Sequence, residues 1–285
     1  MKLRASAVQY HLHTIRSFDE FAEQVEYYVN TAAEFAAGIV VFPELFTTQL
    51  MSIGNGSLRA LTIDHLPSFT NAYRTLFQEL AKQHSMYIVG GTHVTEKAGR
   101  LFNVAYLFYP DGRVVEQPKL HMTPTETEAW RITPGDELRV FETDFGKVAI
   151  LSCYDMEFPE LGRMARARGA DVFFCPSCTD DRQSFHRVRF CSHARAIENQ
   201  VYVVTTGTVG ALPTVDWMRA NFGQAAIIAP NDLPFPPAGV IAEGEVNHDM
   251  VVTADMDLGL LAQVRERGSV RTWQDRRIDL YPDWR

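Results

Sequence analysis

Short apolar segments of strand length alternate with segments of helix length along this chain, and this alternation restricts the possible folds more than any other feature. Residues 3–10 read as a strand, and a helix follows from the capping box SFDE to about residue 37. The buried run GIVVFPEL comes next. Further along, the strand-like runs DVFFC and VYVVTT flank a helix at about 184–199. Alternation of this kind predicts an α/β protein in which helices cover β-sheets.

Hairpin patterns interrupt the alternation and argue against a purely parallel sheet. The segment LFNVAYLFYPDGRVVEQP carries Asp111-Gly112 at a turn between two apolar runs. A second pair of strands meets near Asp144–Gly146. We therefore expect mixed β-sheets with helices on their faces. No repeat and no linker-like stretch divides the chain, so we expect one domain over residues 1–285.

The composition restricts the partners that the protein binds. The formal net charge is −8, and no run of five or more basic side chains occurs, so we expect a small-molecule or protein partner and neither nucleic acid nor a membrane surface. The apolar runs are shorter than the roughly 18 to 20 residues of a spanning helix, and the first residues do not resemble a signal peptide. We therefore expect a cytoplasmic protein. Four cysteines are too few for a disulfide scaffold, and in a reducing compartment we expect them to be free thiols.

Three reactive side chains follow three of the apolar runs. Glu44 ends IVVFPE, Lys119 ends RVVEQPK and Cys153 ends KVAILSC. Ligand sites of α/β proteins are built where strands end, so these three side chains are candidates for one site. A thiolate attacks a carbonyl carbon, a carboxylate moves protons and an ammonium stabilises an oxyanion. The set therefore predicts acyl-transfer chemistry.

The residues around the cysteine fit this interpretation. The Lys119 ammonium and the N-terminus of a helix near residue 157 would both favour the thiolate of Cys153. The backbone N–H of Tyr154, directly after the cysteine, is the natural second donor to an oxyanion. Asp155 reads as the cap of the following helix.

The segments that carry these residues resemble those of the nitrilase, or carbon–nitrogen hydrolase, superfamily. VVFPELF resembles the segment around the family's catalytic glutamate, PKLHM the segment around its lysine and LSCYDMEFPEL the segment around its nucleophilic cysteine. TPGD (133–136), HARAIENQVYVV and WQDRRIDLY match further family patterns, so the resemblance covers almost the whole chain. It implies an α/β fold with four layers, an α-β-β-α sandwich that contains two mixed β-sheets.

The resemblance also implies a mechanism without a metal or an organic cofactor. In it, Glu44 is the general base, Lys119 stabilises the tetrahedral intermediate and Cys153 forms a thioester that water hydrolyses. Many family members pair subunits, so the resemblance implies a homodimer or larger homo-oligomer. The C-terminal tail, at about 265–285, would then pack on a partner subunit.

Many members also carry a second glutamate between the lysine and the Pro-Gly-Asp sequence. TETEAW offers Glu126 and Glu128, and counting back from Pro134 favours Glu128. The resemblance implies that this glutamate positions the substrate and hydrogen-bonds to Lys119.

The residues after the cysteine favour amide hydrolysis, with release of ammonia or an amine. Tyr-Asp follows Cys153 as in amidase-like branches of the family, whereas nitrilases tend to have Trp-Glu there. N-carbamoyl amino acid hydrolases usually place arginines soon after the cysteine, where this chain has Met156 and Glu157. Nitrile hydrolysis, N-carbamoyl hydrolysis and acyl transfer to an amine or thiol remain as alternatives.

Four other side chains are candidate substrate contacts. Glu157 would attract a cationic substrate, although an acid in the first turn of a helix is stabilised by the helix dipole in any case. Arg182 and His186, in TDDRQSFH, would rim the pocket, and Cys178 would line it. CPSC (175–178) is also a possible redox or zinc motif, but it lacks a second ligand pair and follows a strand, so we favour neither interpretation.

Overall fold

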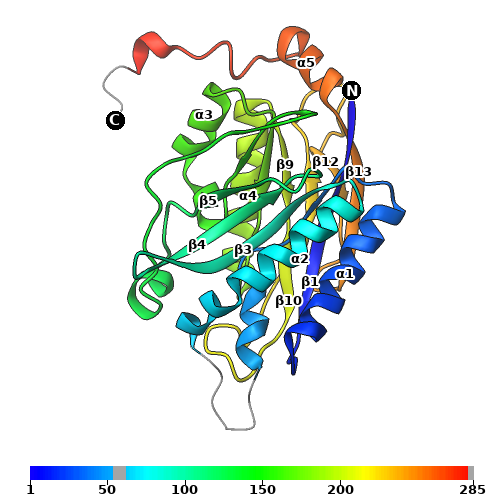
Figure 1. Ribbon diagram of the computed structural model, residues 1–285. Coiled ribbons are helices and arrows are strands. Elements are labelled where there is room, and N and C mark those ends of the chain that lie inside the picture. The colour runs from blue at the N-terminus through cyan, green and yellow to red at the C-terminus, as the bar shows by residue number, and fades with distance from the viewer. Residues whose placement is uncertain (54–61, 282–285) are drawn as a thin grey trace.

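Two mixed β-sheets pack face to face between two layers of helices in the computed structural model, which describes residues 1–53 and 62–281 (Figure 1). Helices α1 and α2 cover the outer face of one sheet, and helices α3 and α4 cover the outer face of the other. This arrangement confirms the predicted four-layer α-β-β-α sandwich.

The first sheet has seven strands and contains the N-terminal strand β1 (Lys2–Leu12). β1 pairs in parallel with β2 and β10 and antiparallel with β13. The predicted hairpin is formed by β4 and β5, and Gly112 in its turn has a φ of +86°. The strands are, in order, β10 (Gly207–Gly210), β1, β2 (Ile39–Val41), β3 (Tyr87–Lys97), β4 (Arg100–Phe108) and β5 (Val114–Pro118), with β13 (Met250–Asp257) paired to β1.

The second sheet has six strands, and its centre is parallel. β7, β8 and β9 run in parallel, whereas β6, β11 and β12 pair antiparallel with their neighbours. In order, the strands are β12 (Val240–Glu243), β11 (Ala226–Ile228), β9 (Tyr202–Thr205), β8 (Val172–Cys175), β7 (Gly146–Ile150) and β6 (Phe141–Thr143).

The helices begin and end close to the predicted positions. Ser17 caps the first helix as the capping box predicts, since its hydroxyl accepts a hydrogen bond of 3.2 Å from the Glu20 N–H. The α-helices are α1 (Phe18–Glu34), α2 (Thr70–Gln83), α3 (Pro159–Ala167), α4 (Arg182–Asn199) and α5 (Leu258–Arg267). None of the helices within the described residues is long and apolar enough to cross a membrane.

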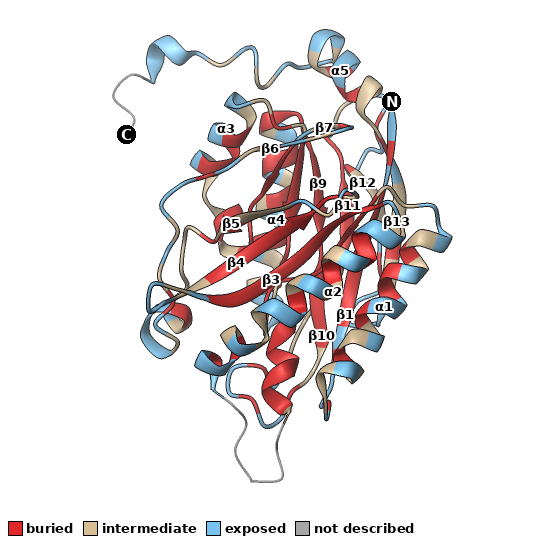
Figure 2. Ribbon diagram, viewed as in Figure 1, coloured by how far each residue is buried: buried red, intermediate tan, exposed pale blue. Residues whose placement is uncertain are grey.

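The strands alternate between two apolar layers. Along β1, Ala5 and Ala7 face the core between the sheets, whereas Val8 and Tyr10 face the core under α1 and α2. A third core lies between the second sheet and helices α3 and α4. Figure 2 shows both sheets largely buried and the outer faces of the helices exposed. Because helices or the other sheet cover both faces of each sheet, a ligand site is expected at the ends of the strands.

Candidate active site

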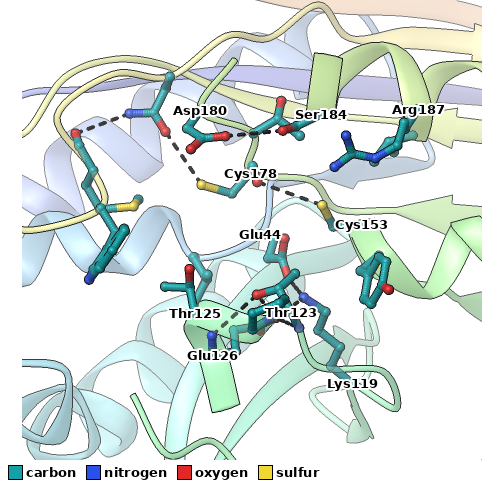
Figure 3. Close-up of a pocket in the computed structure, with 18 of the residues that line it drawn as sticks. Glu44, Lys119, Thr123, Thr125, Glu126, Cys153, Cys178, Asp180, Ser184 and Arg187 are labelled. Atoms are coloured by element: carbon teal, nitrogen blue, oxygen red, sulfur yellow. Dashed lines mark hydrogen bonds and ion pairs between the residues drawn. The ribbon is translucent and has the colours of Figure 1, made fainter. Parts of the chain in front are cut away.

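Three strand ends bring Glu44, Lys119 and Cys153 to the wall of one cavity (Figure 3). Glu44 follows β2, Lys119 follows β5 and Cys153 follows β7. The Lys119 Nζ donates a hydrogen bond of 2.8 Å to the Glu44 Oε1, and both side chains are 2% exposed. The cavity has a volume of about 470 Å³. Their predicted convergence is therefore present.

A second carboxylate binds the lysine, and it belongs to Glu126. The Glu126 Oε2 accepts hydrogen bonds of 2.6 Å from the Lys119 Nζ and 3.0 Å from both the N–H and the hydroxyl of Thr123. Glu128 is exposed. The expectation that Glu128 bonds to Lys119 is wrong, because the π-helical turn Thr125–Ala129 directs Glu126 inward.

Asn103 joins the two carboxylates and was missed by the sequence analysis. Its side-chain amide on β4 donates 3.0 Å to the Glu44 Oε1 and 2.9 Å to the Glu126 Oε1. Its backbone carbonyl accepts a hydrogen bond of 2.8 Å from the Lys119 N–H. The one signal for Asn103 was a polar residue inside the apolar run LFNVAYLF.

The surroundings of Glu44 and Glu126 shift their pKa values in opposite directions. Burial raises the pKa of Glu44 above its usual range, although Lys119 opposes the shift. Burial acts in the same direction on Glu126, but Lys119 and the other donors outweigh it and lower the pKa of Glu126. Burial also opposes the charge of Lys119, yet the two carboxylates raise its pKa well above the usual range. Lys119 and Glu126 are therefore a permanent ion pair.

The cysteine is a thiol in this state of the site. Burial and the Glu44 carboxylate raise the pKa of the Cys153 thiol well above its usual range, and Lys119 offsets them only in part. The 3₁₀ helix Cys153–Glu157 follows the cysteine, and α3 begins only at Pro159. Lys119 therefore favours the thiolate as expected, but burial and Glu44 oppose the thiolate more strongly. The neighbouring Glu44 is a candidate base for the thiol proton.

The backbone at Cys153 turns sharply. Its φ of +47° lies in the left-handed region, which non-glycine residues seldom adopt. The cysteine side chain consequently faces the cavity, and Tyr154 lines the same wall.

Glu157 and Cys178 also reach the cavity, as predicted. The Glu157 carboxylate pairs with the Arg187 guanidinium at 3.4 Å, and the exposed fractions of the two side chains are 17% and 58%. Cys178 is a free cysteine that accepts a hydrogen bond of 3.2 Å from the Thr208 hydroxyl. Its backbone carbonyl lies 3.8 Å from the Cys153 Sγ.

Arg182 and His186 do not reach this cavity. Both lie on a face of α4 that borders a separate surface depression beside Phe190. Ser184 and Arg187 of the same helix line the cavity instead, because they lie on the face turned towards Cys153 (Figure 3). The sequence analysis missed these two and the further wall residues Trp130, Asp180, Trp217 and Asn221.

No group of three or more histidine, cysteine, aspartate and glutamate side chains is placed to hold a metal ion in the described part of the chain.

Comparison with known proteins gives consistent results. The chain is 47% identical over 279 residues to the probable hydrolase YhcX of Bacillus subtilis, covering 98% of this chain and 54% of that protein. It therefore spans about half the length of this relative. It is 28% identical to the omega-amidase NIT2 of Xenopus tropicalis, covering 98% of this chain and 97% of that one.

Solved structures share the fold. A carbon-nitrogen hydrolase from Helicobacter pylori superposes with a TM-score of 0.81 at 21% identity, covering 99% of this chain and 97% of that one. An amidase from Nesterenkonia, with a TM-score of 0.75 at 20% identity, covers 99% of this chain and 100% of its own; its structure shows acrylamide added at the active-site cysteine. The sequence model of the carbon-nitrogen hydrolase family matches residues 4–266. Together with the cavity that holds Glu44, Lys119 and Cys153, this match establishes that the chain belongs to the carbon-nitrogen hydrolase family.

Proposed function

We propose that the protein hydrolyses the C–N bond of a small amide through a thioester on Cys153, releasing ammonia or an amine. The observation that carries the proposal is the convergence of a thiol, a carboxylate and an ammonium on one cavity, at Cys153, Glu44 and Lys119. The amidases among the solved structures and the omega-amidases among the relatives support an amide as the substrate.

The first half-reaction forms the thioester. Glu44 accepts the thiol proton while the Cys153 Sγ bonds to the amide carbon, and the carbonyl oxygen becomes an oxyanion. The Lys119 ammonium and the Tyr154 N–H bind that oxyanion. When the intermediate collapses, the C–N bond breaks, and Glu44 gives its proton to the leaving nitrogen.

The second half-reaction returns the free enzyme. Water adds to the thioester carbon while Glu44 accepts one of its protons, and the same two donors hold the new oxyanion. Collapse breaks the C–S bond, the sulfur regains the proton from Glu44, and the acid leaves. No metal and no organic cofactor takes part.

Glu126, which lines the cavity, and Asn103, which lies behind it, support both steps. Glu126 keeps Lys119 charged and oriented, and Asn103 holds Glu44 and Glu126 at a fixed separation.

The side of the cavity that carries Glu157 and Arg187 contacts the rest of the substrate. Glu157 is already paired with Arg187. The ammonium of an amine-bearing amide therefore binds Glu157 most strongly when it displaces the Arg187 guanidinium from this ion pair. We propose that Cys178 lines this wall without reacting, and that the protein works in the cytoplasm, where its thiols stay reduced.

The deciding experiment measures ammonia released from ω-amides, aliphatic amides, N-carbamoyl compounds and nitriles, with Cys153→Ala as the blank. We expect release from amides, none from the blank, and an acyl adduct on Cys153 in quenched samples by mass spectrometry. Cys175→Ser should stay active, since Cys175 is buried at the end of β8 outside the cavity. Ammonia release that persists in Cys153→Ala would refute the proposal. Transfer of the acyl group to an added amine in place of water would instead identify an acyltransferase.

A further inference from the structure

The carboxylate of Asp155 lies in the contact between the two segments that carry Lys119 and Cys153. Asp155 belongs to the 3₁₀ helix that begins at Cys153, and its side chain is 2% exposed. The expected role as a cap of α3 is not what the structure has, because the bonds of Asp155 run to residues 34 and 35 positions earlier.

Both carboxylate oxygens accept hydrogen bonds from the backbone directly after the lysine. The Leu120 N–H lies 3.3 Å from the Oδ1 and 3.2 Å from the Oδ2, and the His121 N–H donates to the Oδ1 at 2.7 Å. The His121 Nδ1 lies 3.0 Å from the same oxygen. A buried carboxylate with several donors is held strongly in place.

Other contacts complete the frame around the lysine. The Lys119 N–H donates to the Asn103 carbonyl, and the Lys119 carbonyl accepts from the Gly135 N–H, each at 2.8 Å. These bonds fix the lysine to the first sheet and to the TPGD turn. The hydrogen bonds of Asp155 join the segment after Lys119 to the cysteine segment. The His121 ring also stacks on Phe158, with centroids 3.6 Å apart.

The proposed reaction needs such a link. The oxyanion is bound by Lys119 on one segment and by the Tyr154 N–H on the other, so their separation must match the tetrahedral intermediate. A misplacement of about 1 Å can cost on the order of 10²-fold in rate. Asp155 does not line the cavity, so it acts through the residues that do.

We propose that Asp155 is a positioning residue that ties the Lys119 backbone to the Cys153 turn and so sets the distance between the two oxyanion donors. This inference rests on the proposed amide hydrolysis. It assigns Asp155 no contact with the substrate.

The test is Asp155→Asn. Asparagine has nearly the same shape, but one carboxylate oxygen becomes an NH₂ group that faces a backbone N–H, so one attraction becomes a donor–donor contact. We expect kcat to fall on the order of 10- to 100-fold with little change in KM. Rates are divided by the concentration of folded protein, measured from the amplitude of the urea-unfolding transition, so that unfolded protein does not contribute. Asp155→Ser, which keeps one acceptor oxygen, is the second variant where Asp155→Asn does not fold.

Asp257→Asn is the matched control. The Asp257 Oδ1 also accepts two backbone N–H bonds, from Gly259 at 3.0 Å and Leu260 at 3.1 Å, but at the start of α5 and away from the cavity. This variant should leave kcat per folded protein unchanged.

An unchanged kcat per folded protein in Asp155→Asn, with an active wild type, overturns this inference and leaves the hydrolase proposal intact. An inactive wild type refutes the hydrolase proposal itself. His121→Phe keeps the stacking and the backbone donors, so it should retain most of kcat; a loss as large as that of Asp155→Asn would overturn the assignment to the backbone contacts.

Discussion

The two buried glutamates differ in their surroundings, and their chemistry follows from that difference. Glu126 accepts bonds from Lys119, Thr123 and Asn103, and these donors keep it ionised. Glu44 has fewer donors and lies beside the Cys153 thiol, and burial raises its pKa. Neighbouring carboxylates whose pKa values are pushed apart commonly take different roles in catalysis. We therefore propose the proton-transfer role for Glu44 and the role of counter-ion for Glu126.

Glu126 and Glu128 provide a matched pair for a test. Glu126→Gln removes a charge that contacts Lys119 at 2.6 Å, so the ammonium loses a partner and its orientation. We expect kcat/KM for the best amide to fall on the order of 10²-fold. Glu128→Gln changes an exposed side chain and should leave kcat/KM unchanged. Steady-state ammonia release measures both, and a larger loss in Glu128→Gln would contradict the assignment.

At the scale of the elements, the sequence predicts what local patterns encode. Glu44, Lys119 and Cys153 each follow an apolar run, so their place at strand ends could be predicted. The choice between Glu126 and Glu128 could not, because it depends on a single π-helical turn that no periodicity announces.

The other predictions failed because they depend on contacts between segments that are distant in sequence. Helix α4 was predicted, but the rotation that places Arg187 at the rim of the cavity and Arg182 outside it is set by packing of buried side chains such as Val188 and Ala196 on the second sheet. Asp155 stands where a helix cap is expected, but its carboxylate accepts hydrogen bonds from the backbone after Lys119 instead. Such contacts join segments that are distant in sequence, so a local reading cannot find them.

The contact between α2 and β3 contains a buried histidine that makes stability depend on pH. The His93 ring lies 3.1 Å from the Thr47 hydroxyl and 3.0 Å from the Thr70 hydroxyl, and it stacks on Tyr73 with centroids 4.8 Å apart. Burial lowers the pKa of His93 to about 3. The folded protein therefore keeps this imidazole neutral.

His93→Gln tests this effect. Below the ordinary histidine pKa of roughly 6.5, the unfolded chain binds a proton that the folded chain rejects. As the pH falls from that value towards 3, protonation of His93 in the unfolded chain lowers the free energy of unfolding by about 1.4 kcal/mol per pH unit. Above roughly pH 6.5, His93 is neutral in both states and this loss is absent. Urea unfolding between pH 7 and 4 should show the wild type losing stability faster than the variant by this slope. Parallel stability curves would contradict it.

At the scale of the whole molecule, exposed apolar side chains gather on α4 and on the C-terminal tail. Phe190 on α4 is 66% exposed, and Ile278 and Leu280 on the tail are 70% and 65% exposed. From α5 the tail runs along the upper edge of the molecule, above α3 in the view of Figure 1, and residues 282–285 lie outside the described part. The Thr272 hydroxyl donates 2.7 Å to the Ile197 carbonyl and so holds the tail against α4. We propose that a second copy of the chain covers these side chains.

This homo-oligomer is tested by Ile278→Asp combined with Leu280→Asp. Two carboxylates on the tail would have to be buried without partners in the interface, which costs far more than their exposure in a monomer. We therefore expect the wild type to elute as a dimer or larger assembly and the double variant to elute at a smaller mass, as measured by size-exclusion chromatography with light scattering. Val246→Asp changes another exposed apolar residue, in the loop between β12 and β13, and should keep the wild-type mass. A wild-type monomer, or a double variant with the wild-type mass, would show that the tail does not hold two copies together.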